Sequence, residues 1–346
     1  MRVTLADIAR RLGVSLTTVS MALHNNPRIS SKTRNTVQQA AMEMGFQPDP
    51  FLAGLVAHRR QGGDAKFQGV LAWINHWDDP RRLRALGEFE AYWQGGEEAA
   101  KRLGYQLQEI RWPKGCPAKR IERILLARGI NGILIPPHHH GVEWGDFDWS
   151  PFSLIRFGLS VRPPNSNLVT ADHHRAIVMA MRKILEYGYR RIGLAMCQLY
   201  DDTLGGSFYG GFLWAQKHLQ LPVVPPLKLD RHSSPKGIAL FNEAFKKWME
   251  KYRPEALITF YPEVPPLLRE LGYRIPQDVA VAGTSMLDMP VDAGIDQHSR
   301  GIGRIAAEML IKQVHANERG IPKHPYRVLV ESRWQDGKSL PRLRPV

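Results

Sequence analysis

Residues 3–20 read VTLADIARRLGVSLTTVS, and this stretch decides the fold of the first part of the chain. Thr4 is a good N-cap, and Asp7 three positions later completes a capping pattern that starts a helix near Leu5. Gly13 ends this helix, because glycine readily takes the left-handed conformation that turns the chain. A second helix follows directly, so the stretch has the spacing of a helix-turn-helix.

The second and third helices complete a small three-helix unit. Ser15 caps the second helix, which runs to about Leu23, and Ser30 starts a third helix that ends near Met44. The apolar residues of each helix fall on one face. They are Leu5, Ile8, Ala9 and Leu12, then Val19, Ala22 and Leu23, then Val37, Ala40, Ala41 and Met44. A plain helical subdomain is the alternative, but the turn glycine, the caps and the basic charge favour a DNA-binding head.

The outer face of the second helix is the candidate DNA-reading surface. In a helix-turn-helix this helix enters the major groove, and exposed residues near its N-terminus meet base edges. Those residues are Leu16, Thr17 and Met21. The helix N-termini at Ser15 and Ser30 offer backbone N–H groups and hydroxyls to phosphate.

The net charge of +14 is compatible with a polyanionic partner. Residues 1–60 hold eight cations against three acids, a higher density of positive charge than in the rest of the 346-residue chain. Arg81, Arg82 and Arg84 form another basic cluster, which is more simply a solvated face. Charge therefore supports nucleic-acid binding without proving it.

Several features place the protein in the cytoplasm. No apolar run reaches the roughly 18 to 20 residues that a membrane helix needs, and the N-terminus has no signal-like segment. Cys116 and Cys197 are far apart in the sequence, and neither belongs to a CxxC pair, so we expect reduced thiols and no disulfide scaffold.

From Gly69 onward the pattern changes to short apolar strands that alternate with amphipathic helices. Such alternation predicts doubly wound, parallel α/β sheets, which bind ligands in the crevice at the carboxyl ends of the strands. The expected strands are Val70–Ile74, Tyr105–Ile110, Gly132–Ile135, Ser153–Phe157, Arg191–Ala195, Ala256–Phe260 and Val279–Ala282. Expected helices include Glu88–Leu103, Ala118–Arg128, Arg175–Tyr187 and Phe208–His218.

Residues 3–55 resemble the lactose/galactose repressor family of bacterial transcription regulators. The matching runs are VTLADIA, GVSxxTVSxAL, ISxxTRxxVxxAA and MGFxP, followed by the position of Leu55. Looser matches continue through the core, such as GYRRI at 188–192 and GYRIPQDV at 272–279. The resemblance implies a core like the periplasmic sugar-binding proteins, with two lobes, three crossings and an effector between the lobes.

The resemblance also assigns roles within the head. It implies that Leu16, Thr17 and Met21 read bases. The residues that it implies for phosphate contact are Leu5 (through its backbone), Ser15, Thr18, Ser20, Ser30 and Thr33. The family often has a polar residue where this chain has Met21. Leu16 and Met21 cannot pair with guanine but can pack on thymine methyl groups, so we expect A·T pairs at the contacted steps.

A hinge follows the head. Pro48 and Pro50 stop the third helix, and the segment from Phe51 to about Arg59 is too short to be a stable helix alone. The resemblance implies that it folds in a dimer on DNA, where Leu55 of each subunit wedges into the minor groove. A simple linker with Leu55 packed on the core is the alternative. Asp49 and Ala53 replace the usual Asn and Arg, and both changes remove attraction to phosphate.

The departures from the family pattern fall where an effector would bind. Phe208 stands where the family usually has Arg, and Tyr261-Pro262-Glu263 replaces an expected Asn-Asp pair. The groups that hold sugar hydroxyls in relatives are therefore missing. The candidate effector residues are Asn75, Trp77, Phe208 and Tyr261, and the aromatic ones have core packing as their alternative.

Other functions find less support in the sequence. An α/β enzyme, or a small-molecule binding protein with an accessory helical head, is the alternative, but no GxGxxG, P-loop, GxSxG or HExxH motif is present. His138, His139 and His140 are consecutive and cannot all face one ion, and Asp172-His173-His174 is more simply a helix cap with exposed imidazoles. We expect neither a metal nor a cofactor.

The sequence thus predicts an all-α helix-turn-helix head and a two-lobed α/β core of doubly wound parallel sheets. The expected parts are a DNA-binding domain (1–47), a hinge helix with linker (48–64) and an effector-binding and dimerisation core (65–346). The expected function is a sequence-specific regulator, a repressor by resemblance, on pseudo-palindromic double-stranded operator DNA. A sugar or sugar derivative is the expected effector. Residues 340–346 have no heptad repeat, so we expect a homodimer rather than a tetramer.

Overall fold

The computed structural model describes residues 4–23, 26, 28–44, 46, 67–138, 142–228 and 234–343. Its first unit is the predicted head, made of α1 (Leu5–Leu12), α2 (Leu16–Leu23) and α3 (Ser31–Glu43). The three helices enclose a small core whose fully or nearly fully buried members are Ile8, Ala9, Val19, Ala22, Val37 and Ala41. The helix spacing and inward faces that the sequence predicts are confirmed.

The N-lobe is built on a six-stranded sheet in which every pair of neighbours is parallel, with the order β11-β5-β4-β3-β1-β2. Its strands are β1 (Gly69–Asn75), β2 (Tyr105–Arg111), β3 (Gly132–Ile135), β4 (Ser153–Phe157), β5 (Leu168–Ala171) and β11 (Arg327–Val330). The associated helices are α5 (Pro80–Ala85), α6 (Gly87–Arg102), α7 (Ala118–Ala127) and α13 (Ser299–Ala316). Two hydrophobic clusters fill the two faces, one with α6 and α13 and the other with α7.

The C-lobe has its own six-stranded sheet, with the order β12-β10-β9-β8-β6-β7. Only the pairing of β10 with β12 is antiparallel among its described neighbours. The strands are β6 (Ile192–Met196), β7 (Leu227–Lys228), β8 (Ala256–Thr259), β9 (Ala280–Gly283), β10 (Gly294–Asp296) and β12 (Arg333–Gln335). The helices are α8 (His173–Glu186), α9 (Gln198–Thr203), α10 (Ser207–His218), α11 (Pro235–Tyr252) and α12 (Val264–Glu270).

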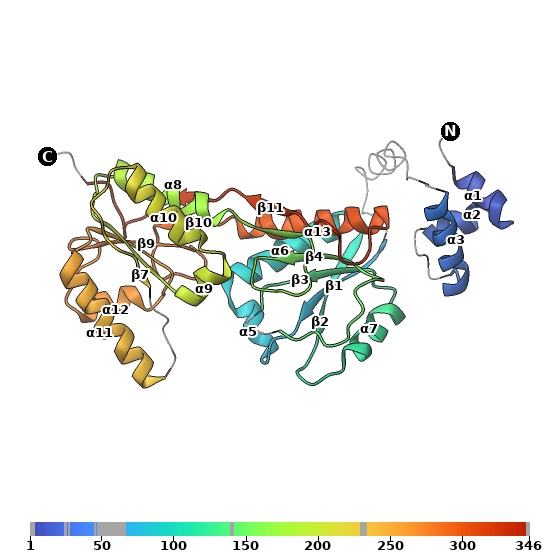
Figure 1. Ribbon diagram of the computed structural model, residues 1–346, viewed down its shortest axis with the longest axis horizontal. Coiled ribbons are helices and arrows are strands. Elements are labelled where there is room, and N and C mark those ends of the chain that lie inside the picture. Colours follow the sequence, from blue (N-terminus) through green and yellow to red (C-terminus); the bar gives the residue numbers. More distant parts are fainter. Residues whose placement is uncertain are drawn as a thin grey trace.

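The chain passes between the lobes three times, as the family resemblance implies. The passages lie between β5 and α8, between β10 and α13, and between β11 and β12. Figure 1 shows the two lobes side by side, with the long α13 of the N-lobe extending toward the C-lobe. Neither lobe is therefore one continuous segment of chain.

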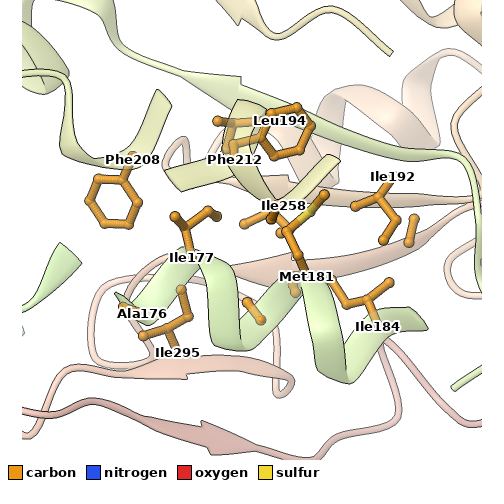
Figure 2. Packing of buried hydrophobic residues seen from close by; sticks show 14 of the residues in the cluster. Ala176, Ile177, Met181, Ile184, Ile192, Leu194, Phe208, Phe212, Ile258 and Ile295 are labelled. Carbon is orange, nitrogen blue, oxygen red and sulfur yellow. The ribbon is translucent and has the colours of Figure 1, made fainter. Parts of the chain in front are cut away.

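The C-lobe core sits between its sheet and the pair α8 and α10. Figure 2 shows Ile177 and Met181 of α8 near Phe212 of α10, with the strand residues Leu194 and Ile258 beside them. All five side chains are buried. This packing fixes the first turns of α8 and α10, from which His173 and Phe208 extend toward each other with ring centroids 5.1 Å apart.

Glycines let α6 and α13 approach at backbone distance in the N-lobe. A Cβ at Gly95 would overlap the carbonyl oxygen of Arg300, and a Cβ at Gly303 would overlap that of Tyr92. No rotamer change can relieve a clash with backbone, so any larger residue must push the helices apart.

We expect Gly95→Ala to destabilise the N-lobe by about 1–3 kcal/mol, because the added methyl forces α6 from α13. Gly210→Ala is the matched control, since Gly210 lies within α10 and a Cβ there would meet nothing within 4 Å. It should stabilise by about 0.5–1 kcal/mol through helix propensity. Urea unfolding of both variants measures the difference, and equal effects would contradict the close-packing assignment.

Candidate nucleic-acid interface and effector site

The head holds its helices by side-chain caps at their N-termini. The Thr4 hydroxyl and the Asp7 carboxylate form a reciprocal capping box on α1, and Gly13 closes that helix with φ +65°. The hydroxyl of Ser15 accepts the backbone N–H of Thr18 at 3.0 Å and so caps α2. These are the caps that the sequence predicts, and they fix the angle at which α2 leaves the turn.

The predicted base-reading residues lie on the accessible side of α2. Leu16 is 52% exposed and Thr17 is also exposed, whereas Met21 is partly buried. An exposed leucine at a helix N-terminus has no packing role in the head, whose core is made by the opposite face. The structure therefore presents Leu16 and Thr17 to a partner, with Met21 one turn further along the same helix.

The predicted phosphate contacts surround two helix N-termini. Ser30 caps α3 by accepting the backbone N–H of Thr33 at 3.2 Å, in the same way as Ser15 caps α2. The hydroxyl pairs Ser15–Thr18 and Ser30–Thr33 are 2.8 and 2.9 Å apart. Both N-termini retain N–H groups without an intrahelical partner, which is the ordinary basis of anion binding. Ser20 is partly buried, as is Leu5.

Cations in the head divide into paired and unpaired groups. Arg10 pairs with Asp7 at 3.1 Å and Arg11 pairs with Glu43 at 2.8 Å. Lys32 lies in the first turn of α3 and makes no ion pair with the described residues. A lysine there is disfavoured by the helix dipole, and a bound phosphate would reverse that cost. Leu55, the predicted minor-groove wedge, lies outside the described residues.

The four predicted effector residues do not share one site in the structure. Asn75, at the end of β1, is fully buried and holds the following turn: its amide donates to the carbonyl of Pro80 at 2.8 Å and to Glu109 Oε1 at 3.1 Å. Trp77 is also buried, and it lines a cavity in the N-lobe. Among the described residues, Asn75 therefore has a structural role in holding this turn. Of the four predicted effector residues, only Trp77 lines the cavity.

Phe208 and Tyr261 are separated by the C-lobe sheet. Phe208 belongs to the cluster shown in Figure 2 and is 1% exposed, whereas Tyr261 packs in a different cluster, edge-on to Phe241 at 4.8 Å. Both aromatic rings therefore follow the core-packing alternative in this conformation. Their roles as effector contacts stay predictions.

A carboxylate from the C-lobe caps a helix of the N-lobe. Asp288, in the loop after β9, accepts the backbone N–H of Gly87 at 2.6 Å and that of Glu88 at 3.1 Å. These are the first residues of α6, so the negative charge lies at the positive end of the helix dipole. This interaction joins the two lobes at a point where the sequence analysis predicts no functional residue.

Buried polar groups gather around this contact. Glu88 is 8% exposed, and burial raises the pKa of its carboxyl to about 7, with Asp288 and Asp296 adding to the rise and the Ser285 hydroxyl opposing it. Glu88 Oε1 and Gln297 Oε1 have no hydrogen-bond partner among the described residues. Unsatisfied buried oxygens from both lobes are what a polar ligand between the lobes would use.

Sequence reasoning missed this group. Glu88 has the pattern of an ordinary acidic residue in the first turn of a helix, and its partner Asp288 is 200 positions away. His173 also differs from the expectation of exposed imidazoles: it is 7% exposed, and burial lowers its pKa to about 4, while His174 is exposed as expected. Asp172 does cap α8, by accepting the N–H of Arg175 at 3.0 Å.

Neither a metal-ligand cluster nor a membrane-spanning helix occurs among the described residues. No group of three or more His, Cys, Asp or Glu side chains there could hold a metal ion, and His139 and His140 lie outside them. None of the described helices combines the length and the apolar character needed to cross a membrane. Cys116 and Cys197 are both free thiols of intermediate exposure.

Two family models match parts of the chain. Residues 4–49 match the model of bacterial regulatory proteins of the lacI family, and residues 181–340 match the periplasmic binding protein-like domain. The HTH-type transcriptional repressor PurR of Haemophilus influenzae is 24% identical over 336 residues, which covers 93% of this chain and 94% of PurR.

Two solved structures show the same fold over 98% of the chain. The transcriptional regulator CelR in complex with cellobiose has a TM-score of 0.59 at 19% identity and is covered completely. The lac repressor dimer bound to operator and the anti-inducer ONPF has a TM-score of 0.54 at 17% identity, with 99% of its chain covered.

A helix-turn-helix head on a two-lobed, periplasmic-binding-protein-like core defines a transcriptional regulator with a sensor domain. The chain is therefore similar, in its head and in its whole fold, to DNA-binding transcriptional regulators of the lactose/galactose repressor family, which is the resemblance that its sequence shows.

The raised pKa of Glu88 predicts a pH dependence of stability. Below about pH 4.5 the carboxyl is protonated in both folded and unfolded chains; between that value and about 7 only the folded chain keeps the proton, so its stability falls as pH rises. Glu88→Gln should remove this decline. Between pH 4 and pH 8 the free energy of unfolding of the wild type should fall by about 3 kcal/mol more than that of the variant. Denaturant unfolding across this range tests it, and parallel pH curves would contradict the assignment.

Proposed function

We propose that this protein is a homodimeric repressor that binds a pseudo-palindromic operator and responds to a small metabolite held between its lobes. A sugar or sugar derivative is the proposed class of effector. PurR is a repressor by name, the lac repressor is a dimer on operator DNA, and CelR holds cellobiose. The action takes place in the cytoplasm, where the DNA is, and involves no catalysis.

The exposed apolar face of α2 is the observation that carries the proposal. Leu16 and Thr17 stand clear of the head core at the N-terminus of a capped helix, where a recognition helix presents its base-reading side chains. Leu16 has no polar group, so it discriminates by contact with thymine methyl groups rather than by hydrogen bonds. Met21 extends the same surface.

Backbone contacts set the register of this helix on the duplex. The N-termini of α2 and α3, with the hydroxyls of Ser15, Thr18, Ser30 and Thr33, face phosphate in the proposed complex. Ser20 and the backbone of Leu5 add to these contacts. Lys32 supplies a cation beside the capped N-terminus of α3.

We assign three parts to the proposed function: the DNA-binding domain is 1–47, the hinge helix and linker are 48–64, and the effector-binding and dimerisation core is 65–346. The Asp288 carboxylate on α6 gives the core a contact that changes when the lobes move relative to each other. Such a movement would alter the spacing of two hinges in a dimer, and so the fit of two heads to the operator.

Selection from randomised duplex DNA with the full-length protein tests the proposal. We expect an enriched site with two inverted half-sites, A·T pairs at the contacted steps, and affinity that falls steeply with salt. A binding protein or enzyme with an accessory helical head would enrich no sequence. Half-sites without inverted symmetry would refute the homodimer.

Met21→Arg should change the preferred base at one symmetric position of the selected site, because a guanidinium can pair with guanine where a thioether cannot. Met42→Arg is the control: it adds the same charge at a residue of α3 that is 70% exposed. The control should leave the motif unchanged while strengthening non-specific binding. An unaltered motif for Met21→Arg removes this residue from base reading.

Leu55→Ala should weaken operator binding by about ten-fold or more and reduce DNA bending, because the wedge that opens the minor-groove step is lost. Dimerisation should be intact. Leu126→Ala, at an exposed position of α7, is the matched control and should bend DNA like wild type. Circular-permutation gel shifts measure the bend; an undiminished bend in Leu55→Ala would show that this residue is only part of a linker.

A further inference from the structure

A cavity of about 630 Å³ lies at the carboxyl ends of β1, β2 and β3 in the N-lobe. Three tryptophans, Trp77, Trp112 and Trp144, form its walls together with the imidazoles of His76 and His138. All of its described lining residues belong to the N-lobe. It is therefore distinct from the polar contact between the lobes, and its size is that of a small-molecule site.

The indole N–H groups in this cavity already have acceptors. Trp77 donates to a backbone carbonyl at 3.0 Å, Trp112 at 3.0 Å and Trp144 at 2.7 Å. Their hydrogen atoms are thus directed into the protein. What the three rings contribute to the cavity is aromatic surface, which attracts cations through its negative face.

Backbone groups hold both imidazoles in place. His138 Nδ1 lies 2.7 Å from the carbonyl of Pro136 and its Nε2 accepts the backbone N–H of His76, so the ring is neutral with hydrogen on Nδ1. His76 Nδ1 contacts the carbonyl of Trp112, which can only accept, so this nitrogen carries the hydrogen.

The rim of the cavity is acidic in a strongly basic chain. Asp78, Glu143 and Asp146 are exposed there, against the single cation Lys114 among the described lining residues, which lies 3.9 Å from Asp78. The acidic and lysine side chains among the described lining residues sum to two net negative charges, whereas the whole chain carries +14. This rim repels anions and attracts cations.

We propose that this cavity binds an organic ammonium ion. The aromatic walls and the negative rim match a ligand that carries a positive charge within apolar groups.

The cavity also has a route to the contact between the lobes. The segment after β1 that lines it, His76 to Asp78, leads through α5 directly to Gly87, which Asp288 of the C-lobe holds. A ligand that moves this segment would shift the start of α6 against the C-lobe. The regulatory consequence rests on the proposed function, whereas ligand binding does not.

Choline and its uncharged isostere 3,3-dimethylbutan-1-ol test the charge requirement on the full-length protein by titration calorimetry. We expect saturable binding of choline and about ten-fold weaker binding of the isostere, since only the cation gains from the rings and the rim. Glu143→Lys should weaken choline binding about two- to five-fold. The same charge reversal on the C-lobe surface, Glu270→Lys, should leave it unchanged.

The two cysteines locate the binding site. Cys116 lines the cavity, and Cys197 lies in the C-lobe. Choline should slow alkylation of Cys116 by iodoacetamide and leave that of Cys197 unaltered, as peptide mass spectrometry can measure. Protection of both, or of neither, overturns the assignment of the cavity.

Equal affinity for choline and the isostere would overturn the ammonium class, as would no saturable binding below about 50 mM choline. If Glu143→Lys and Glu270→Lys changed the affinity for choline equally, the acidic rim would not be the source of that affinity. None of these outcomes bears on selection of an operator from randomised DNA, so failure of this inference and failure of the proposed function are distinguishable.

Discussion

The backbone contact between α6 and α13 is the constraint on which the arrangement of the core depends. Because Gly95 and Gly303 let the helices touch, α13 is fixed against the N-lobe only a few residues after the chain leaves β10 of the C-lobe. The C-lobe loop after β9 is thereby held near the start of α6. Asp288 can then cap α6. The packing of α6 against α13 therefore also brings the two lobes into contact.

The polar groups at this contact are costly in the absence of a ligand. A buried oxygen without a partner costs about 1–3 kcal/mol, and Glu88 and Gln297 each contribute one. Burial at this interface raises the pKa of Glu88 to about 7, because a neutral carboxyl loses less hydration on burial than a carboxylate does. A polar ligand that donates to these oxygens would therefore stabilise the closed arrangement, which is the thermodynamic condition for an effector to shift lobe geometry.

The head could be predicted from the sequence because its signals are local. Thr4, Ser15 and Ser30 each cap a helix within three residues, and the strands expected in the core agree with the structure to within a residue or two. Helix α11 has equally local signals, since Ser234 caps it and Phe241, Phe245 and Trp248 repeat at helical spacing. It is nevertheless not among the helices expected from the sequence. The short β10, β11 and β12 have no such signal, because each is defined by pairing with a distant strand.

The polar contact between the lobes could not be predicted in the same way, because its groups meet only through the three crossings. Phe208 is a candidate through its place in the family pattern, whereas Glu88 joins this polar contact only because Asp288 approaches from the other lobe. Helix N-termini then serve two purposes in one chain. Those of α2 and α3 are capped by neutral hydroxyls and stay open to an external anion, whereas that of α6 is occupied by a carboxylate of the other lobe. Separation of the lobes would therefore remove the Asp288 carboxylate from the N–H groups of Gly87 and Glu88, and α6 would lose the negative charge that stabilises its N-terminus.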